Sequence, residues 1–176
     1  MAGYLVSLRN LNPYRMKSLF TIALFFIVFN SFAQAVKIYD PEADVTIAIS
    51  QGLIRAKAEN KHLFLQIGGN WCPWCLKFHK FCATDSQIDS IMSKDFIAIK
   101  VNYSKENRNL ETLKKLEFPQ RFGFPVFVIL DASGKRIHTQ SSSYLEEGEN
   151  YSKKRVFEFL KQWSPEALNP NHYTTK

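Results

Sequence analysis

Three cysteines are the residues whose type and spacing could do chemistry in this sequence. Cys72 and Cys75 form a C-x-x-C pair within residues 71–75, WCPWC, and Cys82 follows seven residues after Cys75. Two thiols at this spacing can cycle between a dithiol and a disulfide. A thiol at a helix N-terminus has a pKa below its free value of about 8.5, because unpaired N–H groups and the helix dipole stabilise its thiolate. We expect Cys72 at that position and Cys75 one turn further in, facing the interior.

A metal site is the alternative use of the same residues. Cys72, Cys75, His79 and Cys82 form the pattern C-x2-C-x3-H-x2-C, which superficially resembles a zinc knuckle. Four tetrahedral ligands on one continuous helix are geometrically awkward, because Cys72 would lie a turn away from the other three. We therefore expect no bound metal, with Cys82 a small buried apolar residue and His79 a polar surface residue.

Redox chemistry at this pair needs a strand that ends just before Cys72 and a helix that begins there. The apolar run 63–67, which ends at two glycines, is typical of a strand buried on both faces. Pro73 suits the first position of a helix over 71–83.

The rest of the chain alternates between helical and strand patterns. A helix is predicted over 41–60 from the apolar stripe Val45, Ile49, Leu53 and Ala56, although the alternation over 45–49 could instead begin a strand. The other predicted elements are a short helix over 88–92 capped by Asp85, strands at 96–101, 126–130 and 135–140, a helix through 110–116, a polar loop over 141–152 and a last helix carrying Val156, Leu160 and Trp163.

This order predicts an α/β fold with a central mixed sheet of about four strands, helices on both faces and an extra N-terminal helix. The length of 176 residues suits one domain, and the content of 15 Phe, 7 Tyr and 3 Trp excludes global disorder. The net charge is +7, but residues 34–176 carry 20 basic and 16 acidic groups without a basic cluster. Nucleic acid is therefore not an expected partner.

The first 35 residues are predicted to be a signal peptide. Arg9, Arg15 and Lys17 precede an apolar run of 11 residues at 19–29, and a small-x-small cleavage signal ends at Ala35. A membrane anchor is the alternative, but a spanning helix needs about 18 or more apolar residues. Residues 1–15 could also be a mis-called start before Met16. We expect a periplasmic protein, with secretion or membrane anchoring as alternatives, a domain over 36–166 and a loosely ordered tail over 167–176.

The active-site motif, its context and a second motif resemble the thioredoxin superfamily. W-C-x-x-C lies at a strand-to-helix junction, the sequence Gly-Phe-Pro at 123–125 precedes the third strand, and residues 131–135 match the family's hairpin turn. The similarity covers residues 40–163 and is greatest to exported bacterial thioredoxin-like proteins related to the C-terminal domain of DsbD-type thiol:disulfide reductases. It implies that Cys72 attacks, Cys75 resolves and Pro125 is a cis-proline that faces them.

Residues around the motif are predicted to bind substrate or tune the thiols. Trp71, Pro73, Trp74 and Phe124, with Pro125, could form an apolar rim for extended partners, and inward packing of Trp71 is the alternative. Gln66 and Lys100 are the other two candidates, as residues that tune the thiols or transfer a proton.

Many thioredoxins have a buried Asp six residues before the first cysteine, where this chain has Gln66. Glutamine forms hydrogen bonds but exchanges no proton, so Cys75 must lose its proton to water or to another group. Lys100 matches a position at which the family often has a lysine near that acid. It either pairs with Gln66 or projects from the sheet, and we favour projection.

The predicted function is an exported thiol-disulfide oxidoreductase that acts on cysteine-containing exported proteins. Its cofactor is only its own dithiol, its electron donor is an unknown membrane or periplasmic protein, and it acts as a monomer. A reducing or mid-range potential is favoured over strong oxidation, because Trp74 before the second cysteine adds no charge. The alternatives are a redox-inert binding module and, third, a metal-binding protein.

The export signal leads to a first prediction. Protein recovered from the cell envelope should lack residues 1–33 or a closely similar segment, because the charged, apolar and small-residue regions follow one another in the order of a cleaved signal peptide. N-terminal sequencing of the envelope fraction measures this. A membrane-embedded product with the apolar segment intact contradicts it.

Overall fold

The computed structural model describes residues 37–174. Contacts divide the chain into residues 1–35 and 36–176, and the described part belongs to the second unit. The predicted signal peptide lies outside the described residues. Within 37–174, no helix has both the length and the apolar character needed to cross a membrane.

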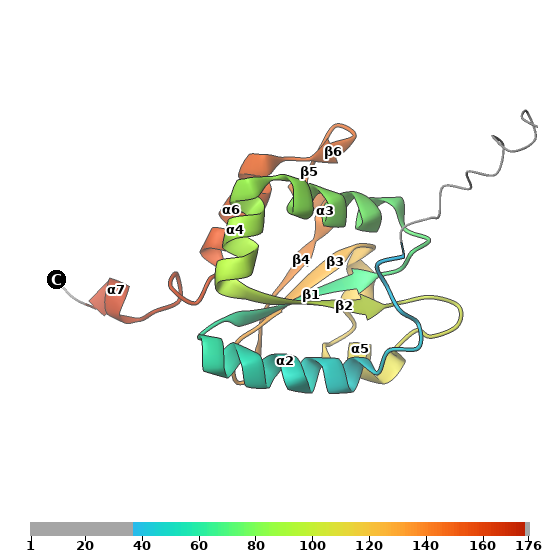
Figure 1. Cartoon of the computed structure of the whole chain (residues 1–176), viewed down its shortest axis with the longest axis horizontal. Helices are drawn as coiled ribbons and strands as arrows, with labels where there is room; N and C mark the ends of the chain where they lie inside the picture. Colours follow the sequence, from blue (N-terminus) through green and yellow to red (C-terminus); the bar gives the residue numbers. More distant parts are fainter. Residues whose placement is uncertain (1–36, 175–176) are drawn as a thin grey trace, which may run out of the picture. The chain divides into compact units, whose positions relative to one another are not determined.

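A four-stranded mixed sheet with helices on both faces forms the domain, as predicted (Figure 1). The strand order is β2-β1-β3-β4, with β1 parallel to β2 and the other pairs antiparallel. The elements are α2 (Val45–Glu59), β1 (His62–Gly68), α3 (Pro73–Thr84), α4 (Ser86–Asp95), β2 (Phe96–Asn102), α5 (Leu110–Lys115), the 3-10 helix η2 (Pro119–Phe122), β3 (Val126–Leu130), β4 (Arg136–Ser141), the 3-10 helix η3 (Ser142–Leu145), β5 (Glu146–Glu147), β6 (Asn150–Tyr151), α6 (Lys153–Gln162) and α7 (Asn171–Thr174).

The two faces of the sheet bury different kinds of side chain. Successive residues of a strand point to opposite faces, so β1 sends Leu63, Leu65 and Ile67 one way and Phe64 the other. The first set packs with aliphatic residues of α2 and α5, and Phe64 packs with aromatic residues under α3 and α6. Figure 1 shows α2 and α5 on one side of the sheet and α3, α4 and α6 on the other.

Helix α2 begins at Val45, four residues after the start of the helix that was predicted over 41–60. Asp44 is the N-cap, and its carboxylate accepts hydrogen bonds from the backbone N–H groups of Thr46 and Ile47. This cap satisfies two N–H groups that the helix itself leaves unpaired, which places the first helical residue at Val45. The strand alternative for 45–49 is therefore wrong, and the predicted apolar stripe packs on the sheet.

The segment 141–152 was predicted to be a polar loop, and this was wrong. It contains η3 and the small hairpin β5–β6, which turns at Gly148 with a φ of 59°. Leu145 and Tyr151 are buried in the aromatic core, and burial of these two side chains orders an otherwise polar segment. In the segment 167–174, α7 forms a single turn whose side chains are exposed.

The aromatic core yields the second prediction. Phe64 lies within 5.2–6.2 Å, between ring centroids, of Phe78, Phe96, Phe127 and Phe159. Phe64→Ala should lower the free energy of unfolding by about 3–5 kcal/mol, because it leaves a cavity among four rings. The matched control is Phe118→Ala, since Phe118 is 52% exposed, and its effect should stay within about 0.5 kcal/mol. Urea denaturation measures both; equal losses contradict the assignment.

Candidate redox site at the start of helix α3

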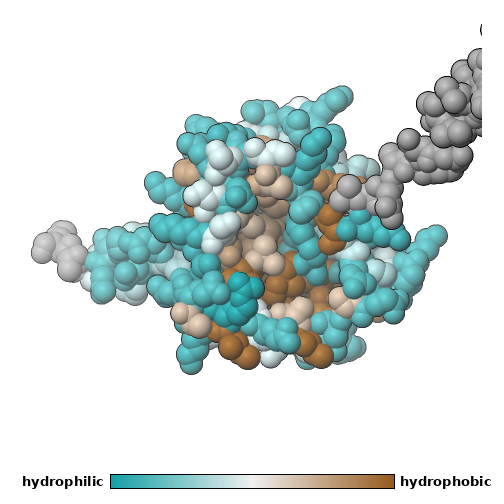
Figure 2. All heavy atoms as spheres, viewed as in Figure 1, coloured by the Kyte–Doolittle hydropathy of each residue, from teal (hydrophilic) through white to brown (hydrophobic). Residues whose placement is uncertain are grey.

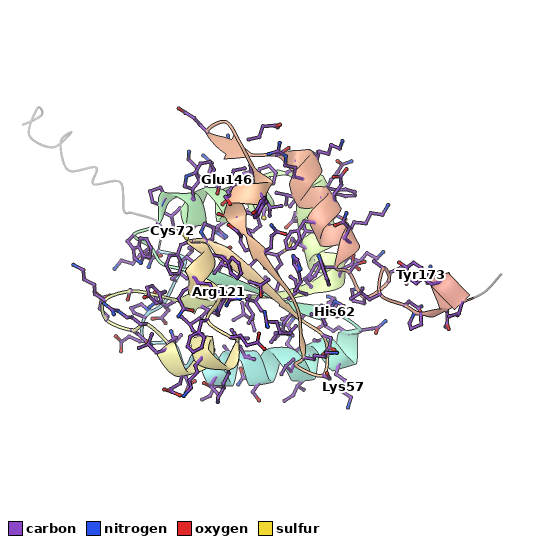
Figure 3. All side chains as sticks on the ribbon, turned by 180° about the vertical axis from the view of Figure 1, so that it is seen from behind. Lys57, His62, Cys72, Arg121, Glu146 and Tyr173 are labelled. Atoms are coloured by element: carbon purple, nitrogen blue, oxygen red, sulfur yellow. A yellow bond between two sulfur atoms is a disulfide. The ribbon has the colours of Figure 1, made fainter. Side chains whose placement is uncertain are left out.

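Cys72 and Cys75 are joined by a disulfide at the point where β1 gives way to α3. Their Cα atoms lie 5.2 Å apart. Figure 3 shows Cys72 at the end of the sheet opposite His62, the first residue of β1. The structure confirms the predicted pairing of these two cysteines and its position between a strand and a helix.

The helix start is built by the two cysteines and the proline between them. Cys72 is the N-cap, and its Sγ accepts a hydrogen bond from the backbone N–H of Cys75 at 3.2 Å. Pro73 occupies the first helical position, where the missing N–H has no cost. Cys75 is fully buried, as predicted, and Cys72 is also only 3% exposed. Both residues of the disulfide are therefore enclosed by the protein.

Two glycines allow the close packing under the disulfide. A Cβ on Gly68 would overlap Cys75 Sγ and would lie 3.0 Å from the hydroxyl oxygen of Tyr39. A Cβ on Gly69 would overlap the indole of Trp71 and lie 2.8 Å from the carbonyl oxygen of Tyr103. The two glycines were predicted only to end a strand, and in the structure they also leave room for the sulfur and the indole.

The predicted aromatic rim is divided between two sides of Cys72. On one side, Trp71 is 55% exposed, so its predicted alternative of inward packing is wrong. Its indole N–H donates to the carbonyl of Tyr103 at 2.6 Å, and its ring meets the ring of Phe124 edge-on at 5.4 Å. Phe124 packs against the cysteine cluster, and the Phe124–Pro125 peptide bond is cis.

Trp74 lies on the other side and is held by its neighbours. Its ring is T-shaped to that of Tyr151 at 5.4 Å, and the ammonium of Lys77 lies 4.6 Å from the ring centroid. The Tyr151 hydroxyl donates to the carbonyl of Trp74 at 3.1 Å. Trp74 is thus half-buried scaffold for the start of α3 rather than a free part of the rim.

Gln66 is the buried polar residue beneath the disulfide. It is 1% exposed, and its amide nitrogen donates to the carbonyl of Cys75 at 3.0 Å and to the hydroxyl oxygen of Tyr39 at 2.8 Å. Its amide oxygen accepts a hydrogen bond from Lys100. A buried amide without partners would be costly, and here both ends are satisfied.

The favoured expectation that Lys100 simply projects from the sheet was wrong. Gln66 and Lys100 are directly paired in the parallel register of β1 and β2, so both side chains point to the same face. Burial lowers the pKa of Lys100 to about 8. A cavity of about 480 Å³ opens beside both residues and is also lined by His79 and Cys82. It lies along β2 between α2 and the α3–α4 pair, where Figure 2 shows apolar residues in a hollow.

His79 and Cys82 belong to this cavity rather than to the disulfide. Burial and the charge of Lys100 lower the pKa of His79. Burial raises the pKa of Cys82 to about 12, so its thiolate is scarce near pH 7. Among residues 37–174, no three His, Cys, Asp or Glu side chains converge as metal ligands would.

Tyr39 is the site residue that the sequence analysis missed. It is 2% exposed and packs with Cys72 and Cys75. Asn70 holds it there: its side-chain oxygen accepts from the N–H groups of Ile38 and Tyr39, and its nitrogen donates to the carbonyl of Tyr39. These contacts join positions 31 or 32 residues apart, and the segment 37–40 has no periodic pattern that could have indicated them.

Comparison with known proteins agrees with this geometry. Residues 49–153, more than half of the chain, match the family described as thioredoxin-like domain. The chain belongs to the thioredoxin-like domain family. It therefore combines the fold of thiol-disulfide oxidoreductases with a Cys72–Cys75 disulfide at the expected junction.

Among solved structures, a disulphide isomerase from Xylella fastidiosa Temecula1 is similar with a TM-score of 0.64 and 24% identity, over 72% of this chain and 96% of that one. The oxidised DsbD C-terminal domain of Neisseria meningitidis is similar with a TM-score of 0.46 and 16% identity, over 68% and 96% of the two chains. Human spermatogenesis-associated protein 20 is 33% identical over 48 residues, which are 27% of this chain and 6% of that protein.

The buried lysine gives the third prediction. Its pKa is about 8 in the folded protein and 10.5 for a free lysine, so between these values the unfolded chain binds more protons. The contribution of Lys100 to the free energy of unfolding therefore rises with pH across that window, by up to about 1.4 kcal/mol per pH unit. Lys100→Met should flatten the plot of unfolding free energy against pH in this window. Loss of the hydrogen bond to Gln66 shifts the whole plot by a constant and does not change its slope.

Urea denaturation of the wild type and the variant from pH 7 to pH 10 measures the difference between the two profiles. Lys94→Met is the control, because Lys94 is an exposed lysine on α4. Its profile should stay parallel to the wild type. A Lys100→Met profile that is also parallel contradicts the lowered pKa.

Proposed function

We propose that this protein is an exported protein-disulfide reductase that acts on cysteine-containing exported proteins. The observation that carries the proposal is the position of the Cys72–Cys75 disulfide. Cys72 Sγ caps the start of α3, where helix N–H groups favour a thiolate, and Cys75 is buried behind it. This arrangement separates an attacking thiol from a resolving thiol. The predicted signal peptide supports work in the periplasm.

The proposed cycle transfers two electrons to the substrate. The Cys72 thiolate attacks one sulfur of a substrate disulfide, the substrate S–S bond breaks, and the first substrate thiolate leaves. Cys75 then loses its proton, and its thiolate attacks Cys72 Sγ. The mixed disulfide breaks, the Cys72–Cys75 disulfide forms and the second substrate thiolate leaves. A dithiol donor in the membrane or periplasm is needed to reduce the protein again.

The proposed docking surface is the side of Cys72 formed by Trp71, Phe124 and Pro125. Trp71 offers an exposed ring, and Phe124 packs between that ring and the cysteine cluster. An extended substrate segment that pairs with the backbone next to Pro125 would place its disulfide beside Cys72, as in strand addition. The rim would then contact the apolar side chains of the segment.

The proposed direction is reduction, or exchange at a mid-range potential. A strong oxidant of this fold needs a strongly stabilised thiolate at its attacking cysteine. In this chain that cysteine would be Cys72, and Trp74 contributes neither charge nor a hydrogen-bond acceptor there. The ammonium of Lys77 lies over the ring of Trp74 and donates to the carbonyl of Glu149. We expect a potential well below the value of about −120 mV that is typical of strong oxidants of this fold.

A trapping experiment gives the fourth prediction. Cys75→Ser should accumulate mixed disulfides with other exported proteins, because Cys72 still attacks but the resolving thiol is missing. Cys72→Ser should trap none, since Cys75 is fully buried. Cys82→Ser is the matched control, because Cys82 lies outside the disulfide cluster, and it should behave as the wild type. Non-reducing gels of envelope fractions with tagged protein, with and without reductant, show the adducts.

An insulin reduction assay with purified protein completes the test. The wild type and Cys82→Ser should reduce insulin at similar rates, and both single variants of the active-site pair should be inactive. The proposal is overturned if no variant traps a partner and the wild type neither reduces insulin nor oxidises a model dithiol. A redox-inert binding module would then be the better description.

A further inference from the structure

The orientation of the Gln66 amide is determined by its partners. Lys100 can only donate a hydrogen bond, so the amide oxygen must face it. The amide nitrogen then faces the carbonyl of Cys75, which can only accept, and the hydroxyl of Tyr39. Gln66 therefore donates to the Tyr39 oxygen, and the hydroxyl is left with its own proton to donate elsewhere.

The packing around Gly68 brings that proton close to Cys75 Sγ. With Cys72 and Cys75 joined in the disulfide, the Tyr39 hydroxyl donates no hydrogen bond within residues 37–174, whether to oxygen, nitrogen or sulfur. Its oxygen and Cys75 Sγ both occupy the space that a side chain on residue 68 would fill, and the Tyr39 ring packs with both cysteines. In the disulfide, Cys75 Sγ is a weak acceptor; as a thiolate it becomes a strong one.

We propose that Tyr39, oriented by Gln66, donates a hydrogen bond to the Cys75 thiolate and so acts as a catalytic residue of the resolving step. The inference rests on the proposed function and names a group that stabilises the Cys75 thiolate in a chain that has Gln66 where many thioredoxins have an acid. Tyr39 keeps its proton throughout. The Cys75 proton goes to water, and the hydrogen bond stabilises the thiolate that attacks Cys72 Sγ.

The environment of Tyr39 keeps it a donor. Burial raises its pKa above that of a free tyrosine, so the hydroxyl remains protonated at neutral pH. The other titratable groups that face the pair are Cys72 at the helix start, Lys100 behind Gln66, and Tyr151, whose hydroxyl is engaged with the carbonyl of Trp74. Lys100 acts at a distance through Gln66, and Tyr39 is in contact.

The test follows Cys75 directly, without a substrate. In a Cys72→Ser background, serine can still cap α3, and Cys75 titrates without a neighbouring thiol. The pKa of Cys75 is read from the carbon-13 shift of its Cβ. Adding Tyr39→Phe should raise that pKa by about one unit, which corresponds to about a tenfold smaller thiolate fraction. Adding Tyr151→Phe, the matched loss of a buried hydroxyl, should leave it unchanged.

A kinetic readout in the protein with both cysteines separates attack from resolution. Reduced protein reacts with an aromatic disulfide reagent in two steps, and each releases one coloured thiolate: Cys72 attacks first, and Cys75 then resolves. Tyr39→Phe should slow the second phase about threefold near pH 7 and leave the first unchanged, because the tenfold smaller thiolate fraction is partly offset by the higher nucleophilicity of the more basic thiolate. Tyr151→Phe should alter neither phase.

A Cys75 pKa that Tyr39→Phe leaves unchanged overturns the inference. If Tyr39→Phe does not fold, 3-fluorotyrosine is placed at position 39 instead. Its more acidic hydroxyl is a stronger donor, so the pKa of Cys75 should fall; no fall overturns the inference. Because the titration involves no substrate, failure of the trapping and insulin assays with a shifted pKa rejects the proposed function and not this role of Tyr39.

Discussion

The buried amide of Gln66 is the interaction on which the rest of the site depends. A polar group at 1% exposure must find partners within the protein, and Gln66 finds them on three separate segments. It joins Lys100 of β2, the first turn of α3 at the carbonyl of Cys75, and Tyr39 of the N-terminal segment. One side chain thereby ties the sheet, the helix and the leading segment together beneath the disulfide.

The division of the sheet into an aliphatic and an aromatic face explains where this amide lies. Gln66 follows Phe64 by two residues, so both point towards α3. Phe64 contributes to an aromatic core, whereas Gln66 meets the start of the helix, where carbonyl and sulfur atoms need polar neighbours. The same strand therefore supplies stability at one end and a hydrogen-bonding platform at the other.

The disulfide is more enclosed than a surface-exposed thiol pair would be. Trp74 and Phe124 pack against it from two sides, and Tyr39 lies beneath it. On the side of Phe124, the ring of Trp71 is 55% exposed. Cys75, at 0% exposure, is enclosed still more completely than Cys72 at 3%.

Local patterns in the sequence determined much of this protein. Short, nearly continuous apolar runs predicted β1 and β3, the stripe on α2 predicted its buried face, and the C-x-x-C motif after a strand predicted where the disulfide lies. Such patterns succeed because they depend on residues close together in the chain. The hairpin at 146–151 escaped them, since only burial of Leu145 and Tyr151 against the core orders its polar residues.

Only the tertiary structure decided which residues surround the two cysteines. The pairing of Gln66 with Lys100 follows from the register of two strands that are 34 residues apart, and the placement of Tyr39 follows from its hydrogen bonds to Asn70. Neither is encoded by spacing along the chain. Both arise because a buried amide and a buried backbone segment must be satisfied by whatever the fold brings next to them.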